Sequence, residues 1–164
     1  MIGSGKTNAV RILETLGIAY GLAAHDPGDG HLDAAEVART LGVPADELFK
    51  TLVARDDEGG IRVYCVPAAA DLSLKKAARA SRVGKVELVP LKDLQPLTGY
   101  VRGGCSPIGM KRRYPVLIDE FATVHERIHV NAGARGLQAI LAPGDLALAC
   151  GGEFADIAGP REYG

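Results

Sequence analysis

Apolar and polar residues are spaced along the chain in two ways, which predict short helices and short strands in mixed order. Helices are expected where apolar residues recur every three or four positions between capping residues. These segments are residues 7–16, 33–41, 44–48, 72–80 and 143–149. Strands are expected where short apolar runs lie between turn residues. These runs are residues 18–24, 50–55, 61–66, 85–89, 116–119, 127–131, 137–141 and 154–157.

Capping residues support two of the helices. Thr7 can cap the start of the first helix, and Gly17 can end it. Asp33 and Glu36 have the spacing of a capping box at the start of the second. The five residues D-D-E-G-G separate the runs 50–55 and 61–66, which predicts a β-hairpin.

The mixed order of elements predicts the fold class. Helices and strands do not follow a strict β-α-β alternation, and no internal repeat, linker or low-complexity segment interrupts them. We therefore expect an α+β (mixed α/β) fold, with helices flanking one mixed sheet. A length of 164 residues fits one domain over residues 1–164.

The composition of the chain excludes some classes of function. The chain has 47% hydrophobic and 24% charged residues, so it has enough apolar mass to fold. Its 19 Lys and Arg and 20 Asp and Glu give a net charge of −1. This excludes a nucleic-acid-binding protein whose whole surface is basic, but it does not exclude a local basic patch. With 5% aromatic residues and no Trp, an aromatic platform for single strands is not expected.

The three cysteines, Cys65, Cys105 and Cys150, form no C-x-x-C pair. This pattern argues against a disulfide framework and a structural zinc site, and it fits a reducing compartment. We find no signal-peptide pattern and no apolar run long enough to span a membrane. We therefore expect a cytoplasmic protein with no membrane partner.

Two short motifs resemble sites but lack the required context. Residues 3–7 (G-S-G-K-T) match only the end of a phosphate-binding P-loop, with no strand before them. Residues 125–129 (H-E-R-I-H) match the zinc motif H-E-x-x-H, which requires a helix. The β-branched neighbours predict a strand instead, on which the two histidines would lie about 13 Å apart. We therefore expect no metal and no cofactor.

The glycine-rich segment 98–111 (T-G-Y-V-R-G-G-C-S-P-I-G-M-K) is the least regular part of the chain. Successive N–H groups in such a loop can form a concave cradle for an anion or an oxyanion. On its own, the segment is also compatible with a purely structural turn.

Other segments accompany the loop in one order and spacing. They are K-T-N-A-V-R-I-L from Lys6, F-K-T-L-V from Phe49, D-L-S-L-K-K from Asp71 and N-A-G-A-R-G-L-Q from Asn131. Together with the loop they resemble the YbaK/EbsC family of aminoacyl-tRNA deacylases, over residues 6 to about 157. This family shares its fold with the editing domain of bacterial prolyl-tRNA synthetases.

The resemblance implies a trans-editing enzyme that releases cysteine from mischarged Cys-tRNA(Pro), and also from Cys-tRNA(Cys). Lys50 is the implied functional lysine, with Thr51 beside it. The implied pocket wall runs from Gly103 through Gly104, Cys105 and Ser106 to Pro107, and Gln138 is a further implied substrate-binding residue. Its partners would be the acceptor end of the tRNA and a prolyl-tRNA synthetase, and no DNA is expected.

The implied chemistry is substrate-assisted. The thiol of the substrate attacks its own ester, and the backbone N–H groups of Gly103 and Gly104 stabilise the charge on the carbonyl oxygen. The sequence itself shows no nucleophile elbow and no paired carboxylates. Cys105 could be a covalent nucleophile, but no His adjoins it in sequence, and an incidental thiol is the alternative.

Three positions depart from the family pattern. Ala23 and roughly Asp33 stand where characterised members have Tyr and Phe, and Gln138 stands where they have Asp. Two alternatives therefore stay open: a deacylase for Ala- or Ser-tRNA, or a non-catalytic module that binds tRNA or a synthetase. The run from Lys111 to Arg113, with Arg102 nearby, is either a solvated charge cluster or a tRNA contact.

Overall fold

The computed structural model of this protein describes residues 6–29 and 32–161. Its helices each contain two turns, apart from one 3₁₀ segment. They are α1 (Asn8–Thr15), α2 (Ala34–Leu41), α3 (Leu74–Ser81), α4 (Leu91–Thr98), α5 (Pro143–Cys150) and the 3₁₀ helix η1 (Glu120–Val124). The strands are β1 (Gly21–Ala24), β2 (Leu48–Asp56), β3 (Ile61–Pro67), β4 (Ala70–Leu72), β5 (Val86–Leu88), β6 (Val116–Asp119), β7 (Ile128–Ala134), β8 (Leu137–Leu141), β9 (Gly152–Ala155) and β10 (Ala158–Pro160).

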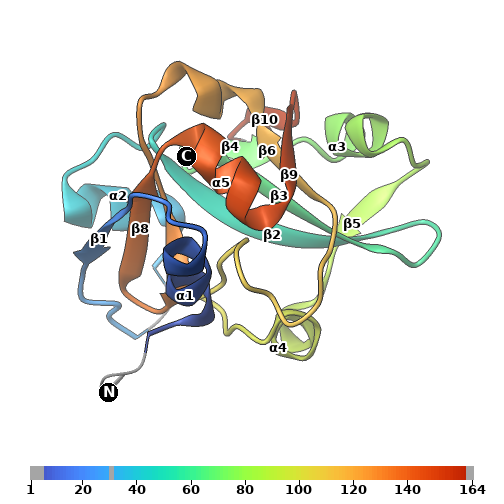
Figure 1. Cartoon of the computed structure of the whole chain (residues 1–164). Helices are drawn as coiled ribbons and strands as arrows, with labels where there is room; N and C mark the ends of the chain where they lie inside the picture. The colour runs from blue at the N-terminus through green and yellow to red at the C-terminus, as the bar shows by residue number, and fades with distance from the viewer. Residues whose placement is uncertain (1–5, 30–31, 162–164) are drawn as a thin grey trace.

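One mixed sheet organises the molecule, as Figure 1 shows. Its strand order is β1-β8-β7-β2-β3-β6-β9, and β5 also pairs with β2. The pairs β2/β7, β3/β6 and β6/β9 are parallel, whereas β1/β8, β7/β8, β2/β3 and β2/β5 are antiparallel. Strands β4 and β10 form a separate two-stranded sheet. The α+β fold class predicted from the sequence is therefore confirmed.

The two faces of the sheet bury different helices. On one face, α1 and α5 pack in a core that includes Phe49 and Val53 of β2 (Figure 1). On the other, α3 packs against Ala54 and Tyr64, and α2 packs against Leu48. This division follows from the strand period of two, which sends successive side chains of β2 to opposite faces.

The predicted caps and hairpin are present. The Thr7 hydroxyl accepts a hydrogen bond from the Val10 N–H at the start of α1, and Asp33 and Glu36 form a capping box at the start of α2. In the turn between β2 and β3, the Asp56 carboxylate accepts the N–H groups of Glu58 and Gly60. The turn is thus held by a carboxylate at the end of β2, as in an Asx turn.

Strand β2 has an open stretch on one side. At its beginning, Leu48 and Phe49 pair with β7, and at its end residues 54–56 pair with β5. Between these two ladders, the residues from Lys50 to Leu52 face neither β7 nor β5 in the pairing register. The sheet therefore has a gap next to β2, and side chains from both faces can meet there.

Some local predictions were wrong. Residues 44–48 do not form a further helical turn: residues 45–47 are a turn, and β2 begins at Leu48. Tertiary contact decides this, because the Leu48 carbonyl accepts the Ala68 N–H and the Leu48 side chain is buried. Helix α4, which contains Pro96, was not predicted at all.

The H-E-R-I-H segment is only partly a strand. His125 follows the end of η1, and regular pairing begins at Ile128, so the strand prediction holds for His129 but not for His125. The remnant of the P-loop pattern lies mostly in residues 1–5, outside the described residues. Within residues 6–29 and 32–161, no helix has both the length and the apolar character needed to cross a membrane.

Candidate functional site

A cavity of about 170 Å³ lies at the gap beside β2 and gathers most of the predicted site residues. Its lining comes from β2, β7, β8, helix α2 and the loop after α4: Leu32, Ala34, Val37, Leu48, Phe49, Lys50, Thr51, Gly103, Cys105, Asn131 and Gln138. We call this space the cavity. Residues from both faces of the sheet line the cavity, because the pairing of β2 with β7 ends at Phe49.

Lys50 stands at the border between the cavity and a larger groove of about 630 Å³. We call this second space the groove, which is lined by Lys50, Leu52, Asp71, Leu72, Ser73, Leu74, Lys75, Lys76, Leu88, Gly159 and Pro160. The Lys50 ammonium nitrogen lies 3.2 Å from Asp71 Oδ1 on β4, and the lysine side chain is only 23% exposed. The ion pair therefore holds a positive charge where the two spaces meet.

Asn131 and Arg135 attach the glycine-rich loop to the β7–β8 hairpin. Asn131 Nδ2 donates to the Gly103 carbonyl at 3.0 Å, and Arg135 Nε donates to the Arg102 carbonyl at 3.0 Å. Gly103 itself has φ +82°, a conformation that side-chain-bearing residues rarely adopt. The loop therefore reaches the cavity in a fixed backbone conformation.

The two glycines of this loop have different roles. The Gly104 N–H donates to the Val101 carbonyl at 2.9 Å, so it is engaged in a turn. Within the described ranges, the Gly103 N–H has no hydrogen-bond acceptor. A Cβ on Gly104 would lie 3.0 Å from the backbone nitrogen of Arg135, so this glycine permits close approach of the hairpin. Of the two predicted oxyanion donors, only the Gly103 N–H is free to act without rearrangement.

The structure does not bring Ser106 and Pro107 to the cavity. Ser106 is fully buried, and its hydroxyl accepts the Ile108 N–H at 3.2 Å. Pro107 lines a different hollow, next to Ile12 and Tyr114. The prediction that these two residues line the substrate pocket is therefore not matched by this cavity.

Cys105 and Thr51 both line the cavity. Burial raises the pKa of the Cys105 thiol to about 11, so little thiolate is present at neutral pH. The Thr51 hydroxyl lies 4.0 Å from the sulfur of the fully buried Cys65, its cross-strand neighbour. Neither environment activates a cysteine as a nucleophile.

Gln138 is buried on β8, with 4% of its surface exposed. Its Nε2 lies 3.5 Å from His25 Nε2, and Ala23 is its cross-strand neighbour. Of the three positions that depart from the family pattern, Gln138 therefore lines the cavity, and Ala23 lies next to Gln138 on the neighbouring strand. Asp33 instead caps α2 and pairs with Arg161, and its neighbour Leu32 lines the cavity.

Part of the cavity lining was not predicted from the sequence. Asn131 lies in the segment N-A-G-A-R-G-L-Q but was assigned no role, and the apolar wall formed by Leu32, Val37 and Phe49 was not predicted. An Asn two residues before a Gly, at the end of a strand, could have indicated a backbone-binding side chain. The apolar residues carried no such signal, because their spacing marks them only as core positions.

Comparison with known proteins assigns the family. The sequence profile of the aminoacyl-tRNA editing domain matches residues 30–148. The chain belongs to this family. A relative from Enterococcus faecalis, EbsC, is 43% identical over 152 residues, which are 93% of each chain, and its name provisionally assigns it Cys-tRNA(Pro)/Cys-tRNA(Cys) deacylase activity.

Solved structures share the fold of this editing domain. The hypothetical protein APE2540 superposes with a TM-score of 0.83 and 23% identity over 93% of this chain and 99% of its own. A protein described, again provisionally, as a trans-editing enzyme for prolyl tRNA synthetase superposes with a TM-score of 0.77. It is 23% identical, and the match covers 93% of this chain and 97% of its own. The enzyme class expected from the sequence, an aminoacyl-tRNA deacylase, is confirmed by the family and by the EbsC match.

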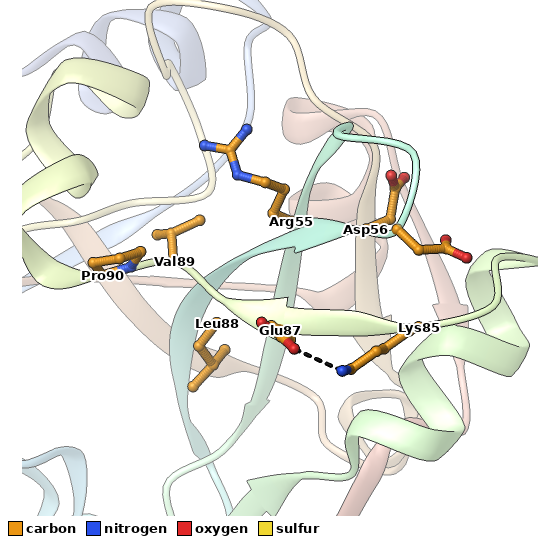
Figure 2. Close-up of a pocket in the computed structure, with 8 residues that line it drawn as sticks. Arg55, Asp56, Lys85, Glu87, Leu88, Val89 and Pro90 are labelled. Carbon is orange, nitrogen blue, oxygen red and sulfur yellow. Dashed lines mark ion pairs between the residues drawn. The ribbon is translucent and has the colours of Figure 1, made fainter.

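Another hollow of the editing domain, of about 250 Å³, lies beside β5 and the hairpin end (Figure 2). Lys85 and Glu87 on its wall pair with each other at 2.8 Å, as the dashed line in Figure 2 marks. Asp56 binds Arg62 at 2.9 Å. Lys85, Glu87 and Asp56 are therefore each in an ion pair, and none of the predicted site residues lines this hollow.

No group of three or more His, Cys, Asp or Glu side chains in the described part of the editing domain could hold a metal ion. The imidazole atoms Nε2 of His125 and Nδ1 of His129 are buried and have no hydrogen-bond partner among the described residues. Burial lowers the pKa of His129, and the nearby Glu47 partly offsets this effect.

Proposed function

We propose that this editing domain acts in trans on mischarged Cys-tRNA(Pro), and also on Cys-tRNA(Cys), and cleaves the ester between cysteine and the terminal ribose. The observation that carries the proposal is that two residues line one small cavity: Lys50, whose charged side chain is 23% exposed, and Gly103, whose N–H has no acceptor among the described residues. The name of the EbsC relative supports cysteine as the amino acid.

Editing is needed because a pocket for proline rejects a smaller side chain only weakly. A difference of one methylene amounts to about 1–3 kcal/mol, which is too little for faithful translation. The aminoacyl ester is already reactive, so an editing site requires positioning and charge stabilisation more than a strong nucleophile of its own. The cavity supplies both functions.

The proposed reaction uses the thiol of the substrate. The thiol loses its proton, and its sulfur attacks the ester carbonyl carbon and forms an S–C bond. The C–O bond to the ribose breaks, and the ribose oxygen takes up a proton. Cysteine leaves as a cyclic thiolactone, which water then opens to free cysteine.

Each residue at the cavity has a proposed role in this reaction. The Gly103 N–H donates to the carbonyl oxygen as negative charge develops there. Lys50 contacts the ribose or phosphate of the terminal adenosine as a point charge. Thr51, Cys105 and Gln138 line the space around the cysteinyl group. Ser106 and Pro107 belong to the same loop outside the cavity, where the Ser106 hydroxyl accepts the Ile108 N–H.

In this proposal Cys105 lines the cavity and does not act as a nucleophile. Its raised pKa leaves it protonated, and among the described residues no histidine lines the cavity beside it.

Two other functions can be distinguished by experiment: a deacylase for Ala- or Ser-tRNA, and a module that binds tRNA or a synthetase without cleaving the ester. Prolyl-tRNA synthetase is the proposed protein partner, and the cytoplasm is the proposed compartment.

A panel of aminoacylated tRNAs tests the proposal. The purified protein is incubated separately with Cys-, Pro-, Ala- and Ser-charged tRNA(Pro), and the rate of amino-acid release is measured with and without prolyl-tRNA synthetase. We expect rapid release of cysteine and retention of proline. Release of alanine or serine ahead of cysteine would assign another specificity, and binding without release of any amino acid would assign the non-catalytic module.

A further inference from the structure

The groove adjoins the cavity at Lys50 and is much larger, about 630 Å³ against about 170 Å³. It lies between β2, β4, β5, β10 and the start of α3. Lys50 lines both spaces, and the open stretch of β2 borders both. An occupant of the cavity can therefore continue into the groove without crossing a hydrogen-bonded strand pair.

The chemistry of an aminoacyl ester requires such a continuation. The amino acid is bonded directly to the ribose of the terminal adenosine, so this nucleotide must lie next to the space that holds the amino acid. The groove is next to the cavity on the Lys50 side. The cavity alone is too small to accept a nucleoside beside the amino acid.

The positive charges of the groove are not equivalent. Lys76 is held by Asp156 and by the Ala158 carbonyl, each at 3.0 Å, and Lys50 is paired with Asp71. Lys75 is exposed and forms no ion pair within the described ranges. Lys75 is therefore the groove cation that can bind a phosphate without first giving up a carboxylate.

The apolar part of the groove suits a flat base. Leu88 of β5 is 49% exposed and Leu74 is 44% exposed, although both are large apolar side chains. Leu52 and Leu72 are half-buried beside them. Apolar side chains that stay exposed in a groove next to cations provide a face for a nucleobase whose phosphate binds the cations.

We infer that the groove binds the 3′-terminal adenosine of the charged tRNA, with its base against the leucines and its 5′ phosphate at Lys75. The inference rests on the proposed function, because it extends the cavity of the editing reaction to the next part of the same substrate. It assigns recognition of the acceptor end to the side of the sheet where β4, β10 and α3 lie.

Equilibrium binding tests this without any need for catalysis. Uncharged tRNA(Pro) is compared with the same tRNA lacking its terminal adenosine, on the wild type, Lys75→Glu and Leu88→Ala. The matched control is Lys92→Glu, an exposed lysine on α4, which lies at the far end of the molecule from β10 in Figure 1. We expect the wild type and the control to lose about fivefold to tenfold in affinity when the adenosine is removed. We expect Lys75→Glu and Leu88→Ala to lose most of that difference.

Two results would overturn the inference. One is a wild type whose affinity does not depend on the terminal adenosine. The other is a Lys75→Glu variant that weakens both tRNAs equally, because this would show general attraction to phosphate. If the wild type releases no amino acid yet shows the adenosine dependence, the proposed deacylation fails and the groove assignment stands. If it releases cysteine but neither variant changes the adenosine dependence, only the groove assignment fails.

Discussion

The side chain of Asn131 donates a hydrogen bond of 3.0 Å to the carbonyl of Gly103, joining two segments that are far apart in the sequence. The same amide group donates to the Ala134 carbonyl at 3.2 Å, and its oxygen accepts the Gly133 N–H at 2.6 Å. One side chain thus fixes both the irregular end of β7 and the loop that carries the free Gly103 N–H. The proposed oxyanion donor lies in the preceding peptide unit, whose Arg102 carbonyl is bound by Arg135, so Asn131 and Arg135 together fix its position.

Replacing Asn131 should therefore slow the reaction more than it weakens substrate binding. Asn131→Ala frees the Gly103 carbonyl, which lies in the peptide unit next to the one that carries the Gly103 N–H. A displacement of about 1 Å at a catalytic group can cost up to about 100-fold in rate. We expect kcat for Cys-tRNA(Pro) to fall about 10-fold to 100-fold, with a smaller change in KM. Asn8→Ala on α1 is the control, because among the described residues the Asn8 side chain accepts a hydrogen bond from the exposed Arg11 alone. An Asn131→Ala enzyme with unchanged kcat would show that the loop holds its position without the amide.

Lys50→Ala should remove most of the activity without unfolding the protein. A hydrogen bond to a charged group contributes about 1.5–3 kcal/mol, so we expect a loss of roughly 10-fold to 100-fold in kcat/KM. Lys92→Ala is the matched control for loss of an exposed lysine. Thermal unfolding followed by circular dichroism checks that the fold persists. Near-normal turnover by a folded Lys50→Ala protein would remove this residue from the site.

The loop variants should show a pattern that separates the two possible roles of Cys105. Gly103→Val should be inactive, because φ +82° does not suit a β-branched residue and the N–H would move. Cys105→Ser should stay largely active, because the substrate supplies the thiol. Rates of cysteine release and intact-protein mass spectra are measured for both variants. An inactive Cys105→Ser, together with an acyl group trapped on Cys105 of the wild type, would show covalent catalysis.

Stability should fall in mild acid because of His129. Burial lowers the pKa of its imidazole below the ordinary value of 6.5, and Nδ1 has no hydrogen-bond partner among the described residues. Below about pH 6.5 the unfolded chain therefore binds a proton at this residue before the folded protein does, which lowers the free energy of unfolding as the pH falls. Above pH 6.5 this contribution does not change.

Urea unfolding at pH 7.5 and pH 5.5 measures the effect. The wild type should lose more stability between the two values than His129→Gln, which cannot take up the proton. Equal losses in the two proteins would mean that the folded protein accommodates the charged imidazole.

Much of the fold was predictable because local signals agree with the tertiary structure. The capping box at Asp33 and Glu36 and the hairpin after Asp56 depend on neighbouring residues, so the sequence shows them directly. Residues 44–48 were misassigned because Leu48 is recruited to β2 by contacts with distant residues. Strands β4 and β10 are three residues long and are separated by about half of the chain, so no local pattern indicates them.

The site was predictable only in part, and chiefly through the family resemblance. Lys50, Thr51 and Gln138 came from motifs and do meet at the cavity. The different roles of Gly103 and Gly104 could not be read from the sequence, because they depend on which N–H the turn at Val101 engages. The groove was not predictable either, since β4, β10 and α3 create it together.

The most direct test of the account compares two amino acids on one tRNA. Cysteine and serine differ only in the atom that would attack the ester, and at neutral pH a hydroxyl supplies almost no anion compared with a thiol. Single-turnover release is therefore measured from tRNA(Pro) charged with cysteine and from the same tRNA charged with serine. We expect cysteine to leave more than about 100-fold faster than serine at neutral pH. Equal rates for the two amino acids would contradict it, because the thiol of the substrate would then have no part in the reaction.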